Sequence, residues 1–214
     1  MHPQWKRLTA SIALGSLLLL SSGATSEAGE PKEKIRQTIN AVLAVLADPA
    51  LSAPEKAQEK RAKIRQVITQ RFGFKEMAQR AMGRHWRKLK AAQRQEFVAL
   101  FSDLLERSYI SKIEAYGGDP DDIKYLRERI DPDGRARVRT EILGSRDLVV
   151  EVEYRFLKRG SEWEVYDVAI EGVSLVNNYR TQFNKIIRQE SYAALVKKMR
   201  LKLEQEVAVS KHAG

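Results

Sequence analysis

The segment Val165–Phe183, VYDVAIEGVSLVNNYRTQF, decides the fold of this 214-residue chain. It opens with the alternation of a strand, turns at Gly172, and continues with apolar residues at helical spacing, among them Val176 and Tyr179. Ser174 stands just before the helical part and predicts an N-cap, because its hydroxyl can accept a hydrogen bond from a free backbone N–H. The segment therefore predicts a strand, a tight turn and an amphipathic helix, with little catalytic chemistry.

The residues before this segment alternate in the same way. We expect strands near residues 123–130, 136–143, 148–157 and 163–170, joined by turns short enough for antiparallel hairpins. The clearest alternation starts at Val150 and places Val152 on an apolar face, with Glu151 and Glu153 facing water. The sequence predicts a four-stranded antiparallel meander with one face exposed to solvent and the other covered by helices.

The first half of the chain has the period of helices. Helices are expected over residues 31–47, 52–72, 74–82 and 91–116, and two more close the chain over 174–188 and 191–206. Ser52 with Glu55 predicts a capping box at the second helix. No internal repeat or long linker interrupts the pattern, so residues 29–214 are expected to form one α+β domain.

The N-terminus has the pattern of an export signal. A basic start at Lys6 and Arg7 precedes an apolar run over residues 8–20, which is too short to span a bilayer, and small residues follow. We expect residues 1–28 to be a cleavable signal peptide, cut after Ala24 or Ala28, and the mature protein to reside in the periplasm. The chain has no cysteine, so disulfides, thiolate ligands and a lipid-bearing cysteine are excluded.

The net charge and the small number of potential catalytic residues limit the functions that this chain can have. The formal net charge is +10, and the anionic partners available to an exported protein are lipid head groups, membrane surfaces and acidic protein faces rather than nucleic acid. Only His85 and His212 would survive signal removal, so no metal site is expected. Strand alternation places Asp167 on the same face as Trp163 and Val165, which is unusual for a carboxylate. Three explanations are open: Asp167 is a general base in a pocket, it makes a structural hydrogen bond, or a β-bulge turns it outward.

The opening segment resembles the pattern VYDVxxxGVSLVxNYRxxF of the toluene-tolerance family, the MlaC-like periplasmic phospholipid-binding proteins. Residues 81–86 are similar to a second pattern of that family, LGRxW, with Met82 where Leu is usual, and Glu171 stands where many relatives have Asp. The resemblance implies an NTF2-like α+β fold, in which a four-stranded curved antiparallel sheet and helices enclose an apolar cavity. It also implies a non-enzymatic carrier without cofactors that shuttles phospholipid between an outer-membrane lipoprotein complex and an inner-membrane ABC transporter complex with an MCE-domain protein, which maintains outer-membrane lipid asymmetry.

Candidates for the cavity lining are apolar residues of the long helix, the third strand and the opening segment. Three other functions stay open: an exported NTF2-like enzyme that uses Asp167 with Tyr166 or Tyr179, a basic adaptor protein without a ligand, and a nucleic-acid binder, which the export signal disfavours. The lipid itself, a glycerophospholipid or a hopanoid, and the direction of transport stay open as well. The expected lipid-binding residues are Phe101, Leu105, Tyr109, Val150, Val152, Tyr154, Val173, Val176, Tyr179 and Phe183.

Overall fold

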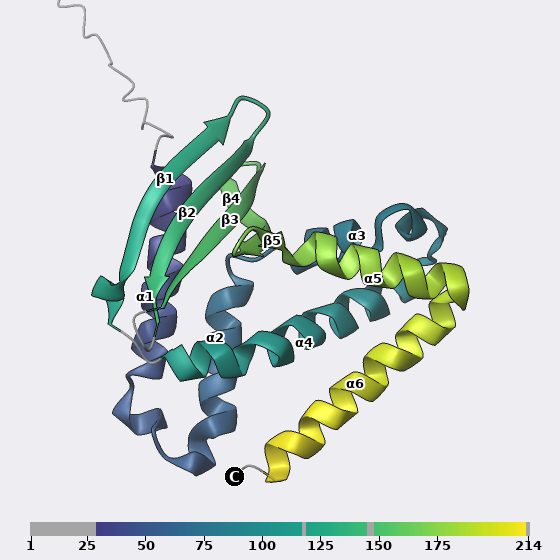
Figure 1. The fold of residues 1–214 in the computed structure, drawn as a ribbon, viewed down its shortest axis with the longest axis horizontal. Helices are drawn as coiled ribbons and strands as arrows, with labels where there is room; N and C mark the ends of the chain where they lie inside the picture. Colours follow the sequence, from purple (N-terminus) through teal and green to yellow (C-terminus); the bar gives the residue numbers. More distant parts are fainter. Residues whose placement is uncertain (1–28, 117–118, 145–147, 213–214) are drawn as a thin grey trace, which may run out of the picture.

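The computed structural model describes residues 29–116, 119–144 and 148–212, with side chains described as far as residue 205. The expected signal peptide, residues 1–28, lies outside the described residues. The fold is α+β, as the sequence predicts, and Figure 1 shows a curved sheet with α1 at one end of the molecule and a group of helices at the other. The helices are α1 (Glu30–Leu46), α2 (Ala57–Thr69), α3 (Phe74–Met82), α4 (Ala91–Tyr116), α5 (Leu175–Gln189) and α6 (Tyr192–His212).

The sheet is antiparallel and its strands neighbour one another in chain order. It has five strands rather than the four expected. The fifth was missed because it has only two residues, too few for any period, although Ala169 and Ile170 pair with Ser174 and Val173. The strands are β1 (Ile123–Asp131), β2 (Arg135–Leu143), β3 (Val149–Arg159), β4 (Glu162–Ile170) and β5 (Val173–Ser174).

One face of the sheet packs against α1. Ile35 of α1 is almost fully buried among Val138, Phe156 and Trp163 of the sheet. The link from α1 to α2 contains two short 3-10 turns, η1 (Pro49–Leu51) and η2 (Pro54–Lys56). The capping box expected at Ser52 is wrong, because its hydroxyl donates back to the carbonyl of Pro49 at 2.7 Å and α2 starts only at Ala57.

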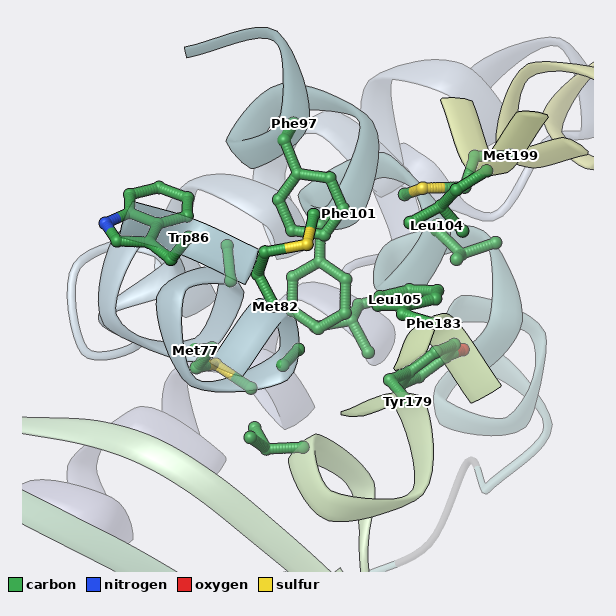
Figure 2. Close-up of a cluster of buried hydrophobic side chains, with 14 of the residues drawn as sticks. Met77, Met82, Trp86, Phe97, Phe101, Leu104, Leu105, Tyr179, Phe183 and Met199 are labelled. Carbon is green, nitrogen blue, oxygen red and sulfur yellow. The ribbon is translucent and has the colours of Figure 1, made fainter. Parts of the chain in front are cut away.

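A second core lies among the helices. Figure 2 shows aromatic side chains of α4 and α5 meeting at its centre, where the rings of Phe101 and Tyr179 contact edge to face with centroids 5.4 Å apart. Phe97 and Phe183 meet in the same way at 5.7 Å. The predicted cap of α5 is confirmed, since the hydroxyl of Ser174 accepts a hydrogen bond from the N–H of Asn177 at 3.0 Å. This core fixes α4 and α5 relative to each other.

Candidate functional site

An apolar cavity of about 480 Å³ lies between the sheet and helices α1, α2 and α4. The cavity-facing sheet residues alternate with outward residues, whereas the helices contribute residues spaced three or four apart. Its lining includes Ile35, Ile39, Val42, Leu43 and Leu46 of α1, Ile64 and Ile68 of α2, Leu105, Tyr109, Ile110, Ile113 and Tyr116 of α4, and Ile123, Ile142, Val150, Val152, Tyr154, Val168 and Ile170 of the sheet.

Five of the expected lipid-binding residues lie in this lining: Leu105, Tyr109, Val150, Val152 and Tyr154. Phe101, Val176, Tyr179 and Phe183 instead lie in the helical core, because α5 turns its apolar stripe toward α3 and α4 rather than toward the sheet. Val173 is 58% exposed at the sheet end. Helical spacing identifies an apolar stripe but does not say which of two cores it joins.

The largest omission of the sequence reasoning is α1. Its stripe, which includes Ile39, Val42 and Leu46, lines one side of the cavity. The signal was present, because these residues recur at helical spacing in the sequence. The stripe gives no information about distance in space, however, and the cavity side of α1 is set by its packing on β2.

The charged residues that line the cavity are Lys112 of α4 and, at the seam between α2 and α4, Arg65 and Glu106. Arg61 donates two hydrogen bonds to Glu114, at 2.9 and 3.0 Å, and Arg65 pairs with Glu106 and with Asp103, the latter at 3.0 Å. We call these contacts the ion-pair seam. Arg65 and Glu106 themselves belong to the cavity lining. This wall is therefore closed by side chains that cross from one helix to the other.

The tyrosines around the cavity are held in their neutral form. Burial raises the pKa of Tyr109 and of Tyr154, and it raises the pKa of Tyr125, behind the lining, to about 12. A phenol that is neutral at physiological pH adds no charge to an apolar cavity. The cavity therefore suits an apolar ligand.

Asp167 does not face the cavity. Arg155 of β3 pairs with Asp167, but the next residue, Phe156, pairs with Val165, so Tyr166 is an extra residue that reverses the alternation. The carboxylate of Asp167 accepts hydrogen bonds from the Ser174 hydroxyl at 2.6 Å, the Val176 N–H at 3.0 Å and Arg155 at 3.0 Å. The bulge and the structural hydrogen bonds anticipated from the sequence are both present, and Asp167 fastens the start of α5 to the sheet.

Within residues 29–116, 119–144 and 148–212, none of the helices is both long enough and apolar enough to cross a membrane. No group of three or more histidine, aspartate or glutamate side chains there is arranged to hold a metal ion.

Comparisons with known proteins agree with this geometry. A solved structure of a phospholipid-binding protein from Ralstonia solanacearum, in complex with a phospholipid, superposes with a TM-score of 0.71 and 26% identity, covering 82% of this chain and 97% of the other. The intermembrane phospholipid transport system binding protein MlaC of Haemophilus influenzae is 23% identical over 131 residues, 60% of this chain and 61% of that protein. The chain thus spans about three fifths of the length of this curated relative. The sequence model of the MlaC protein family matches residues 36–201, and the chain therefore belongs to the MlaC family.

Proposed function

We propose that this protein binds a phospholipid with its acyl chains in the cavity and carries it through the periplasm. The observation that carries the proposal is the cavity of about 480 Å³, lined mainly by aliphatic and aromatic side chains of α1, α2, α4 and four strands, with Phe74 and Met77 of α3 and Leu175 of α5 beside them. Its size is in the usual range of ligand sites, and its wall offers few polar groups that could orient a reacting substrate. The phospholipid named for the Ralstonia solanacearum structure supports the same ligand class here.

The energetics require an enclosed site of this kind. Two acyl chains hold about 30 methylenes at about 0.8 kcal/mol each, so the free energy that keeps them out of water is roughly 20 to 25 kcal/mol. A surface groove would leave much of the acyl-chain surface exposed to water. An apolar cavity between a sheet and three helices supplies shielding similar to that of a membrane, and exchange with a membrane then has a small net free energy.

The cellular role follows from the expected export and from the family. In this proposal residues 1–28 are removed as a signal peptide, and residues 29–214 act as one soluble lipid-binding domain in the periplasm. The domain takes lipid from, or gives lipid to, an outer-membrane lipoprotein complex and an inner-membrane ABC transporter complex with an MCE-domain protein. Such traffic would maintain the lipid asymmetry of the outer membrane. The relative from an intermembrane phospholipid transport system supports this role.

Mass spectrometry of a solvent extract tests the proposal. The protein is exported, purified without detergent and extracted with organic solvent, and a second exported protein of similar charge serves as the control. We expect about one phospholipid per protein molecule, enriched over the control. A clean extract, together with failure to load phospholipid from vesicles, would contradict the proposal and favour the ligand-free adaptor. The carboxylate of Asp167, the residue considered for catalysis, already accepts hydrogen bonds from the Val176 N–H at the start of α5 and from Arg155. Asp167 therefore gives no support to the enzyme hypothesis.

A further inference from the structure

A strongly basic surface lies on the helical part of the molecule. We call it the basic patch: it covers the 3-10 segment η3 (Gly83–Lys88), the residues that follow it and the neighbouring side of α5. None of its cations makes an ion pair with a carboxylate within the part of the chain that the structure describes, whereas most arginines of the sheet do. The patch consists of Arg84, Arg87, Lys88, Lys90, Arg94, Arg180, Lys185 and Arg188.

The backbone of the patch is held by contacts with the helical core and with α5. Trp86 is 8% exposed in the helical core and anchors η3, while the guanidinium of Arg94 lies 5.5 Å from its ring and donates to the carbonyls of Trp86 and Arg87. Arg84 and His85 both contact the side-chain oxygen of Asn184 on α5, each at 3.0 Å. The cations are therefore held on a fixed frame, although repulsion among them is unfavourable for folding.

The patch is far from the ion-pair seam at the cavity wall. Lys90 stands at the start of α4 and Lys112, a cavity residue, near its end. A helix rises about 1.5 Å per residue, so roughly 33 Å separate them along the axis. Figure 1 shows α3 and α5 beside the start of α4, with the end of α4 near the sheet. A partner bound to the patch leaves the cavity accessible.

We propose that the basic patch docks the protein on an anionic lipid membrane surface through charge alone. An interface with another protein normally has aromatic or aliphatic anchors at its centre. The exposed large apolar residues of the described chain are Leu126, Leu143, Leu148, Val149, Val173 and Leu201, and none belongs to η3 or α5. A single sign of charge without an apolar anchor fits a fluid layer of anionic head groups, where each lysine or arginine adds to the attraction independently.

This docking goes beyond lipid carriage and does not depend on it. Because the patch is remote from the cavity, docking keeps the carrier close to the membrane and does not itself transfer the lipid. Binding is reversible, since no side chain of the patch inserts into the acyl layer.

Vesicle flotation tests the inference with two double variants of equal charge change. Arg87→Glu/Lys88→Glu reverses two exposed patch residues whose side chains make no hydrogen bond or ion pair within the described residues, and Arg127→Glu/Arg137→Glu reverses two exposed arginines of the sheet. The probes are vesicles with 30% phosphatidylglycerol and vesicles of phosphatidylcholine alone. We expect wild type to bind only the former, the patch variant to bind them roughly thirtyfold more weakly, and the sheet variant to change severalfold at most.

Three results would overturn the inference: equal weakening in both variants, binding that does not depend on phosphatidylglycerol, or no binding by wild type at low salt. If wild type binds poly-glutamate through the patch but not the vesicles, the partner is an acidic protein instead. Circular dichroism and the phospholipid content of each variant are measured in parallel. Unchanged phospholipid content in a patch variant that no longer floats separates docking from lipid carriage.

Discussion

At the scale of single residues, Val152 distinguishes a lipid cavity from an ordinary core. Its side chain is 6% exposed and lines the cavity. In a filled core, Val152→Arg would bury an unpaired charge and unfold a protein whose stability is typically 5 to 15 kcal/mol. In a cavity the arginine stem extends into free space, so we expect a folded variant with a modestly lower Tm and no bound phospholipid. Circular dichroism and lipid extraction measure both.

The control for this variant is Glu151→Arg. Glu153, expected from the sequence to face water, is unsuitable because it is 7% exposed beneath Arg139 and Arg155. Glu151 lies on the outward face directly opposite Glu141, so an arginine there gains an opposite charge. The control should keep both fold and lipid. A folded Val152→Arg protein with a full complement of lipid would remove this strand from the binding site.

We expect substitution of Asp167 to lower the free energy of unfolding without a direct effect on lipid binding. Asp167→Ala removes the acceptor for Ser174, Val176 and Arg155. Breaking a fully buried pair costs about 3 to 5 kcal/mol, and the partial exposure of Arg155 reduces our expectation to about 2 to 3 kcal/mol. Ser174→Ala should cost only about 1 kcal/mol, as for other N-caps. Urea unfolding compares the two, and equal losses would show that Asp167 acts only through Ser174.

Because of Glu153, we expect the free energy of unfolding to depend on pH. Burial alone would raise the pKa of Glu153, but hydrogen bonds and attraction from Arg155 and Arg139 outweigh it and hold the pKa below the ordinary 4.5. A carboxyl with a lowered pKa in the folded state stabilises the fold above its unfolded pKa, and this stability is lost as the pH falls through the folded value. Below about pH 4.5 the free energy of unfolding should therefore fall more steeply for wild type than for Glu153→Gln. Parallel curves for the two proteins would contradict this assignment.

At the scale of elements, the ion-pair seam between α2 and α4 should control how fast lipid exchanges. Arg61→Glu places two carboxylates opposite each other at Glu114, and the double variant Arg61→Glu/Glu114→Arg restores an opposite pair. Partly exposed pairs of this kind contribute about 0.2 to 1 kcal/mol, which corresponds to exchange up to about fivefold faster in the single variant. Transfer of a fluorescent phospholipid to vesicles measures the rate. If the swapped pair does not slow exchange again, the seam is not a barrier.

The elements also show what a sequence can and cannot predict. The predicted bounds of α3 and α4 are confirmed, because Gly83 and a long uninterrupted apolar stripe mark them clearly. The two-residue strand β5 cannot be recognised by its period, because two residues are too few to show one, whereas the bulge at Tyr166 was one of the alternatives predicted for Asp167. Half of the ten predicted lipid-binding residues lie in the cavity lining, and the other half lie outside it. Local spacing identifies a buried side of α4 or α5, whereas the choice between the two cores depends on how distant helices pack.

At the scale of the whole molecule, export gives a direct prediction about mass. We expect periplasmic protein to begin at Thr25 or Gly29, because small residues at Ala24 and Ala28 fit a signal cleavage site. Intact-mass measurement after osmotic release determines the first residue. A full-length chain in the membrane fraction would contradict both the cleavage and the proposed location.

Net charge gives a second prediction for the whole molecule. If attraction between this basic protein and anionic surfaces guides docking, phospholipid transfer to anionic vesicles should slow as salt rises. Exposed charges are screened beyond about 8 to 10 Å at physiological ionic strength, whereas burial of acyl chains is not weakened. The amount of lipid retained without vesicles should therefore stay constant. Transfer rates that do not respond to salt would exclude electrostatic docking.

Helix α4 belongs to both halves of the molecule at once. Its first turns are clamped by the aromatic rings around Phe101, and its last turns form the cavity wall at Tyr109 and Ile113. No proline or glycine interrupts Ala91–Tyr116, so the helix has no hinge of its own. Any displacement of its cavity end would therefore be carried along the whole helix to the end that packs against α6.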